Sequence, residues 1–180
     1  MNALLIIDLQ NDFLPGGALP APEGNRIIPV INRIMNEFDL VIASKDWHSP
    51  DTSHFDHWPP HCIRETSGSE FPGEFNPQAI EQVFLKGTGQ KDDGYSAFEA
   101  TSMNLRSYLR KRNIQRLYLA GLTTEYCVKA TAEDALRWKF PTYIIRDAVA
   151  PVEAHPGDGE KALREMEAAG AVITDSHAIP

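Results

Sequence analysis

The stretch Gly121-Leu122-Thr123-Thr124-Glu125-Tyr126-Cys127-Val128 decides how the chain folds. The apolar run Arg116–Ala120 leads into it, and a helical pattern from about Glu125 to Lys139 leads out of it. This order predicts a strand, a tight turn and a helix with Cys127 in its first turns. Free backbone N–H groups and the helix dipole favour a thiolate at such a place. A lone cysteine there is nevertheless more often a small buried thiol.

Further apolar runs predict strands on both sides of this stretch. Two of them, Ala3–Asp8 and Leu40–Ser44, are continuous, which is typical of parallel strands buried on both faces. The remaining runs are Gln82–Leu85, Thr142–Ile145 and Ala171–Thr174. Helical patterns cover Arg26–Phe38, Met103–Arg112 (capped by Thr101 or Ser102) and Gly159–Ala169. Because strands and helices alternate, we expect an α/β protein in which a parallel sheet of about six strands lies between two helical layers, as a single domain over residues 1–180.

The composition argues against several classes of function. A formal net charge of −8 over 180 residues disfavours a nucleic-acid partner and a basic helix on a membrane surface. No apolar run approaches the length that spans a membrane, and the N-terminus lacks the features of a signal peptide. Two cysteines, Cys62 and Cys127, are too few for a disulfide scaffold. We therefore expect a cytoplasmic protein with two free thiols; its oligomeric state, a homo-oligomer included, stays open.

Reactive side chains follow the first four expected strands where each strand ends. They are Asp8, Asp46 with His48, Lys86 and the turn that holds Cys127. Ligands bind outside the carboxyl ends of parallel strands, so these groups should meet at one edge of the sheet. Taken alone, Asp8 could be a strand-end cap and Lys86 a solvated charge.

Taken together, these groups suit acyl transfer from an amide. A carboxylate beside a thiol can act as a general base and then as an acid toward a leaving amine. An ammonium next to both groups favours their charged forms. Backbone N–H groups in the turn Thr123–Cys127 could bind the oxyanion of a tetrahedral intermediate.

A second cluster of reactive side chains surrounds the long irregular region Ser49–Pro77. A loop of this length in a compact domain is usually functional or disordered. Carboxylate and imidazole together suit Zn²⁺, Fe²⁺ or Mn²⁺, with room left for a water or a substrate atom. A solvated histidine-rich loop is the alternative, and Cys62 could serve as a sulfur ligand instead. The cluster consists of Asp46, His48, His54, His57 and His61.

Aromatic side chains lie near both groups of reactive residues. Phe13, Trp58 and Tyr95 fall in loops after strand ends rather than on the periodic faces of helices or strands. Each one alone is more often a core residue than a site residue. Together they could sandwich a flat aromatic substrate.

Six stretches of the chain resemble the nicotinamidase branch of the isochorismatase-like cysteine hydrolase superfamily. They occur in the order found in that family and cover most of the chain. The first and last are specific to the superfamily, and the Asp-x-His pair with its downstream histidine points to the nicotinamidase branch. The stretches are Leu5–Phe13, Asp46–His48, Trp58–Cys62, Lys86–Gly87, Tyr95–Phe98 and Gly121–Val128.

The resemblance implies a role for each of these residues. The catalytic triad would be Asp8, Lys86 and Cys127, and the oxyanion would be bound by the N–H groups of Thr123 and Cys127. A cis peptide would join Leu122 to Thr123. The metal ligands would be Asp46, His48 and His61, with His54 as a fourth. The substrate pocket would include Phe13, Trp58, Tyr95 and Leu122.

The reaction that the resemblance implies is hydrolysis of nicotinamide to nicotinate and ammonia through a cysteine thioester, as in NAD salvage. One divalent metal ion, Zn²⁺ before Fe²⁺ or Mn²⁺, would hold the pyridine nitrogen, and pyrazinamide would be a second substrate. Two alternatives stay open: a sibling amidohydrolase for an N-carbamoyl or ureido substrate, and a metal-binding or thiol-sensing module without catalysis. The chain departs from the family at Thr123, where alanine is usual, and His57 has no counterpart there.

Overall fold

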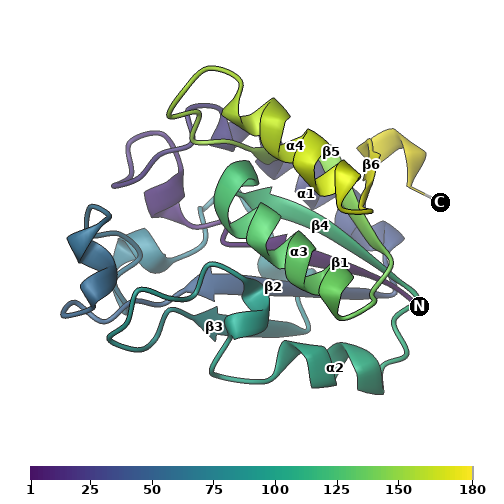
Figure 1. The fold of residues 1–180 in the computed structure, drawn as a ribbon, viewed down its shortest axis with the longest axis horizontal. Helices are drawn as coiled ribbons and strands as arrows, with labels where there is room; N and C mark the ends of the chain where they lie inside the picture. Colours follow the sequence, from purple (N-terminus) through teal and green to yellow (C-terminus); the bar gives the residue numbers. More distant parts are fainter. Residues whose placement is uncertain (180) are drawn as a thin grey trace.

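The computed structural model describes residues 1–179 and shows six parallel strands in one sheet, in the order β3-β2-β1-β4-β5-β6 (Figure 1). Every neighbouring pair of strands is parallel, which confirms the fold class expected from the sequence. The strands are β1 Asn2–Ile7, β2 Leu40–Asp46, β3 Gln82–Lys86, β4 Arg116–Leu122, β5 Thr142–Ala150 and β6 Val172–Thr174.

Three helices pack on one face of the sheet and one helix packs on the other. They are α1 Ile27–Ile34, α2 Leu105–Lys111, α3 Lys129–Arg137 and α4 Asp158–Ala168. Alternate residues of β1 point to opposite faces, so Leu5 packs with α2, α3 and α4, whereas Leu4 and Ile6 pack with α1. In Figure 1, α3 crosses in front of the sheet and α1 lies behind it. Within the described residues, no helix has the length and apolar character needed to cross a membrane.

Several element boundaries differ from those expected, and α1 ends at Ile34 rather than Phe38 while α3 begins at Lys129 rather than at about Glu125. Strand β5 continues past Ile145 to Ala150, because the register between β4 and β5 shifts and pairing resumes beyond the charged pair Arg146 and Asp147. Helix α2 is capped by neither Thr101 nor Ser102. Its cap is Asn104, whose side chain accepts a hydrogen bond of 2.8 Å from the N–H of Ser107.

The expected binding crevice lies at the carboxyl ends of β1 and β4, the two central strands of the sheet. Strand order reverses there, and in open parallel sheets the crevice outside the carboxyl ends at such a point is where ligands bind. Asp8 directly follows β1, and Cys127 lies in the turn after β4. The long loops after β1, β2 and β3 gather at the same end, on the left of Figure 1.

Gly121 allows β1 and β4 to approach closely at this edge. Its φ is +112°, a conformation that side chains disfavour, and a Cβ atom there would lie 2.0 Å from the carbonyl oxygen of Ile7. A glycine is therefore required immediately before the turn that carries Cys127.

We expect Gly121→Ala to lower the free energy of unfolding by about 2–4 kcal/mol, because it adds a backbone clash to an unfavourable φ. Urea unfolding measures the loss. Gly16→Ala is the matched control, since Gly16 also has a positive φ (+94°) but open space around its Cβ position. Equal losses in the two variants would contradict the close approach of β1 and β4.

Candidate active site

Asp8, Lys86 and Cys127 meet at the carboxyl edge of the sheet, as the sequence predicts. Lys86 is the last residue of β3, and its Nζ lies 2.8 Å from Asp8 Oδ2 and 3.5 Å from Cys127 Sγ. All three side chains are buried. Asp8 has a φ of +46°, a conformation rare for residues other than glycine and one that clusters at functional sites.

Further hydrogen bonds hold the carboxylate and the ammonium in place. Ser44 donates from its hydroxyl to Asp8 Oδ1 at 2.7 Å. The ammonium of Lys86 also donates to Asp46 Oδ1 and to the carbonyl oxygen of Gly94. The Lys86 side chain is therefore fixed by two oxygen acceptors and by its ion pair with Asp8, and it presents its charge to the sulfur of Cys127.

Burial and the neighbouring charges together set the protonation states of Asp8 and Lys86. It raises the pKa of Asp8 to about 6, although the Lys86 ammonium acts in the opposite direction. Burial alone would lower the pKa of Lys86, but Asp46 and Asp8 outweigh it and raise that pKa well above its usual range. Lys86 is therefore a permanent cation, whereas Asp8 is a carboxylate at neutral pH that can readily take up a proton.

The protonation state of Cys127 differs from the expected thiolate. Burial raises the pKa of the Cys127 thiol well above its usual range, and Lys86 only partly opposes this effect. A thiol enclosed by protein loses the solvation that stabilises its anion, and this loss exceeds the benefit of the ammonium. At rest Cys127 is therefore a thiol, and a carboxylate oxygen of Asp8 lies within 4.8 Å of its sulfur.

The turn that presents Cys127 has an unusual backbone. The peptide bond between Leu122 and Thr123 is cis, as the family resemblance implies. Residues Thr124–Val128 form one π-helical turn before α3 begins. The carbonyl oxygen of Thr123 accepts hydrogen bonds from the N–H groups of Tyr126, at 3.2 Å, and Val128, at 3.1 Å. The backbone around Cys127 is thus held on both sides of the cysteine.

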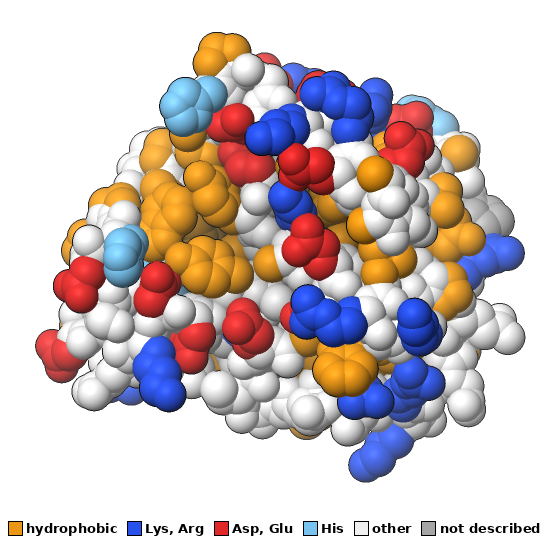
Figure 2. All heavy atoms as spheres, in the orientation of Figure 1, with side chains coloured by type: hydrophobic (Ala, Val, Ile, Leu, Met, Phe, Trp, Pro, Cys, Tyr) orange, Lys and Arg blue, Asp and Glu red, His pale blue; other side chains and the backbone are white. Residues whose placement is uncertain are grey.

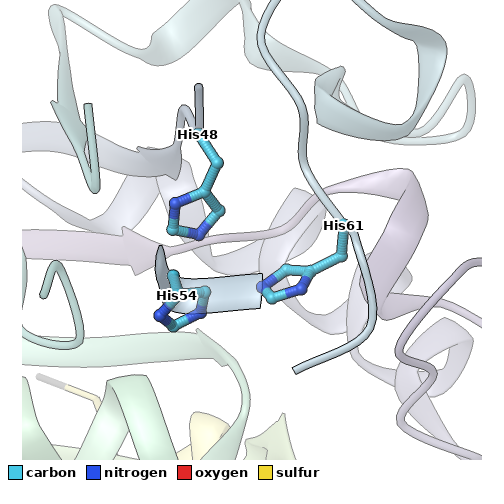
Figure 3. Close-up of side chains that lie close together, drawn as sticks. All are labelled: His48, His54 and His61. Atoms are coloured by element: carbon cyan, nitrogen blue, oxygen red, sulfur yellow. The ribbon is translucent and has the colours of Figure 1, made fainter. Parts of the chain in front are cut away.

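Three buried imidazole rings converge next to this triad (Figure 3). Ring nitrogens of His48, His54 and His61 lie within 4.8 Å of one another. Each Nδ1 atom is hydrogen-bonded outside the cluster: that of His48 to the Gly87 carbonyl oxygen at 3.0 Å, that of His54 to Asp92 at 2.7 Å and that of His61 to the Pro59 carbonyl oxygen at 2.7 Å. These bonds leave the Nε2 atoms for the centre of the cluster, and the buried Nε2 of His48 has no hydrogen-bond partner among the described residues.

Asp46 completes a donor set that fits a divalent metal ion. Its Oδ2 lies 3.6 Å from His48 Nε2 and 3.8 Å from His61 Nε2. Burial would raise the pKa of Asp46, but Lys86 and the histidines hold it below its usual range. Burial lowers the pKa of His54 and of His61, which favours the neutral imidazole that binds metals. Three nitrogens and one carboxylate oxygen suit Zn²⁺, Fe²⁺ or Mn²⁺.

Gln10 supports Asp46, a role that the sequence did not indicate. Its side-chain amide accepts from the N–H of Asp46 and donates to the carbonyl oxygen of Asp46, both at 2.8 Å. Gln10 follows β1 and Asp46 ends β2, so the side chain continues the pairing of these strands beyond β1. The only signal in the sequence was the place of Gln10 within the stretch Leu5–Phe13, and the structure shows that its side chain is buried.

One cavity opens onto both the thiol and the imidazoles. Hydrophobic side chains surround a hollow on the left of Figure 2, at the end of the molecule where the strands of Figure 1 terminate. Trp58 donates from its indole N–H to the hydroxyl oxygen of Tyr95 at 2.9 Å, so these two walls are joined. The residues lining the cavity include Phe13, Leu19, His54, Trp58, His61, Tyr95, Thr123, Tyr126, Cys127 and Val152.

Three residues that the sequence suggested for the site lie outside the cavity, and the sequence did not indicate three of the residues that line it. Leu122 is not among the lining residues and packs in the core on the α1 side of the sheet. The His57 side chain is 69% exposed and contacts Asp92 outside the cluster. Cys62 is free, buried and part of the same core. Of the missed residues, Tyr126 could have been found beside the cysteine, whereas Leu19 and Val152 lie in loops whose paths the sequence pattern does not fix.

Comparisons with known proteins agree with this geometry. The model of the Isochorismatase domain matches residues 2–178. The nicotinamidase of Escherichia coli (strain K12) is 36% identical, with 96% of this chain and 93% of that protein covered. Among solved structures, the pyrazinamidase of Pyrococcus horikoshii in complex with zinc is 40% identical with a TM-score of 0.86, covering 97% and 98% of the two chains. The L. infantum protein PnC1 in complex with nicotinate is 30% identical with a TM-score of 0.92, covering 99% and 94%. The chain therefore belongs to the isochorismatase family.

Proposed function

We propose that this chain is a single-domain amidohydrolase that converts nicotinamide to nicotinate and ammonia. One observation carries the proposal: a buried thiol with its own carboxylate base and ammonium opens into the same aromatic-lined cavity as a cluster of three imidazoles and a carboxylate. Relatives named as nicotinamidases, and a similar structure in complex with nicotinate, support the choice of substrate.

The first half of the reaction forms a thioester. Asp8 takes the proton from the Cys127 thiol, and the sulfur attacks the amide carbon to form a C–S bond. The carbonyl oxygen gains negative charge, which the N–H groups of Thr123 and Cys127 stabilise. Asp8 then gives its proton to the amide nitrogen, the C–N bond breaks, and ammonia leaves.

The second half of the reaction releases the acid. Asp8 takes a proton from water as the water oxygen attacks the thioester carbon. The C–S bond breaks, the proton on Asp8 returns to the sulfur of Cys127, and the nicotinic acid that forms loses its remaining water-derived proton to solvent to give nicotinate. Lys86 keeps its proton throughout and stabilises the carboxylate form of Asp8 at 2.8 Å.

The aromatic side chains and the histidine cluster of the cavity would bind the substrate ring. Phe13, Trp58 and Tyr95 supply flat faces against a pyridine ring. A divalent metal ion would be held by Asp46, His48, His54 and His61, where it would supply a Lewis acid for the pyridine nitrogen. Zinc is the first candidate, since a similar pyrazinamidase is in complex with zinc, and this similarity also supports pyrazinamide as a second substrate.

An N-carbamoyl or ureido substrate has no ring nitrogen and would leave the histidine cluster unexplained.

We expect Cys127→Ala to reduce ammonia release from nicotinamide by about a thousandfold or more, because no other group can form the thioester. Cys62→Ala, which removes the other buried thiol, is the control and should keep most of the activity. Ammonia release from N-carbamoyl substrates, assayed in parallel, tests the sibling activity. Undiminished turnover by Cys127→Ala would contradict the mechanism.

The pKa of Asp8 predicts how activity depends on pH. Since protonated Asp8 cannot accept the thiol proton, kcat/KM should fall about tenfold per pH unit below about 6 and level off above it. The profile is measured with bound metal quantified at each pH, so that loss of metal is scored separately. A profile that stays flat through pH 6 in the metal-loaded protein would show that Asp8 is not the base.

We expect one metal ion per chain, and we expect His48→Ala to abolish its retention, because the variant removes a ligand from the centre of the cluster. His155→Ala is the control, since the His155 side chain is 87% exposed and lies outside the cluster, so this variant should retain metal and activity. Elemental analysis after dialysis, with ammonia release before and after a chelator, provides the measurement. Full nicotinamide turnover by metal-free protein would rule out the metal-dependent activity.

A further inference from the structure

One carboxylate outside the triad and the metal cluster contacts residues from both walls of the cavity. Asp92 Oδ1 accepts from His54 Nδ1 at 2.7 Å and from the Tyr95 hydroxyl at 2.9 Å. The Tyr95 hydroxyl in turn accepts from the Trp58 indole at 2.9 Å. A single oxygen of Asp92 therefore joins a candidate metal ligand to the two aromatic rings assigned to substrate binding.

His54 differs from the other two histidines in its outer partner. His48 and His61 each bond a backbone carbonyl oxygen, whereas His54 bonds a charged side chain from a separate loop. A carboxylate behind a ligating imidazole fixes the ring orientation and raises its basicity, and the loss of such a partner typically weakens metal binding 10–100-fold. His54 is thus the one histidine of the three whose outer partner is a side chain that a substitution can remove.

Hydrogen bonds hold the loop at 87–94 against the segment that carries His54, which brings Asp92 next to His54. The N–H and hydroxyl of Ser53 both donate to the Gln90 carbonyl oxygen, at 3.2 and 3.0 Å. The Thr52 hydroxyl donates to the Lys91 carbonyl oxygen at 3.2 Å. Thr52 and Ser53 directly precede His54, and Gln90 and Lys91 directly precede Asp92, so the two loops are joined immediately before the Asp92–His54 contact. The same loop ends at Gly94, whose carbonyl oxygen accepts from Lys86.

We propose that Asp92 is a positioning residue that couples metal binding at His54 to substrate binding between Trp58 and Tyr95. The inference rests on the proposed nicotinamide hydrolysis and adds a residue to it. Asp92 Oδ1 fixes the orientation of the His54 ring, which is a candidate metal ligand. The same oxygen fixes the position of the Tyr95 hydroxyl, and this hydroxyl fixes the Trp58 ring through its hydrogen bond to the indole. Loss of the carboxylate should therefore weaken both metal and substrate binding while leaving Asp8, Lys86 and Cys127 in place.

The first test measures metal affinity in the absence of substrate. We expect the zinc dissociation constant, obtained by competition with a chromophoric chelator, to rise about 10–100-fold in Asp92→Ala and less in Asp92→Asn, which keeps an acceptor oxygen. Asp93→Asn is the matched control, because it removes the same charge one residue away from the hydrogen-bonded carboxylate. Equal zinc constants in the Asp92→Ala and Asp93→Asn variants would overturn the proposal.

The second test separates positioning from general damage to the fold. At saturating zinc, Asp92→Asn and Tyr95→Phe should each raise KM for nicotinamide several-fold, with a smaller change in kcat. Tyr95→Phe keeps the Asp92–His54 contact and should leave the zinc constant near that of the unaltered chain. The double variant should show no further rise in KM, because both changes break one chain of hydrogen bonds. Additive effects on KM would contradict the coupling.

The outcomes also distinguish this inference from the proposed function. A wild-type chain that neither retains zinc nor releases ammonia from nicotinamide would contradict the proposed function. A wild-type chain that does both, with Asp92 variants indistinguishable from Asp93→Asn, would contradict the role of Asp92 alone.

Discussion

The contact on which the site depends is the buried ion pair of Lys86 with Asp8 and Asp46. An unpaired ammonium in this position would be strongly destabilising, so both carboxylates are needed to keep it charged. The two oxygens of Asp46 also face different groups: Oδ1 accepts from Lys86, and Oδ2 lies toward His48 and His61. One aspartate therefore joins the surroundings of the Cys127 thiol to the histidine cluster, and neither part can be moved without the other.

The strand order explains how residues distant in sequence reach this contact. Strands β3, β2, β1 and β4 are neighbours, so their carboxyl ends bring Lys86, Asp46, Asp8 and the Cys127 turn to one edge. The close approach at Gly121 fixes the two central strands against each other. The sheet thus supplies the reacting groups, while the loops supply the histidines, the aromatic rings and Asp92.

Sequence patterns were sufficient for the sheet and for the residues at its strand ends, since apolar periodicity and the binding rule for parallel sheets are local or topological. Three features required the structure. The raised thiol pKa of Cys127 depends on burial by several loops, which no pattern reports. Leu19 and Val152 line the cavity from irregular segments, and Asp92 contacts two of the lining residues, His54 and Tyr95, from another irregular segment. The extension of β5 to Ala150 depends on a register shift against β4 that its charged residues concealed.

The central claim is that Cys127 forms a covalent acyl intermediate with the substrate. The most direct measurement is rapid acid quenching of the protein during nicotinamide turnover, followed by peptide mass analysis, with hydroxylamine added in a parallel reaction to intercept the thioester. The account predicts a nicotinoyl group on the peptide that contains Cys127 and formation of the hydroxamate. Nicotinate formation without either product, or with the nicotinoyl group on another residue, would contradict it.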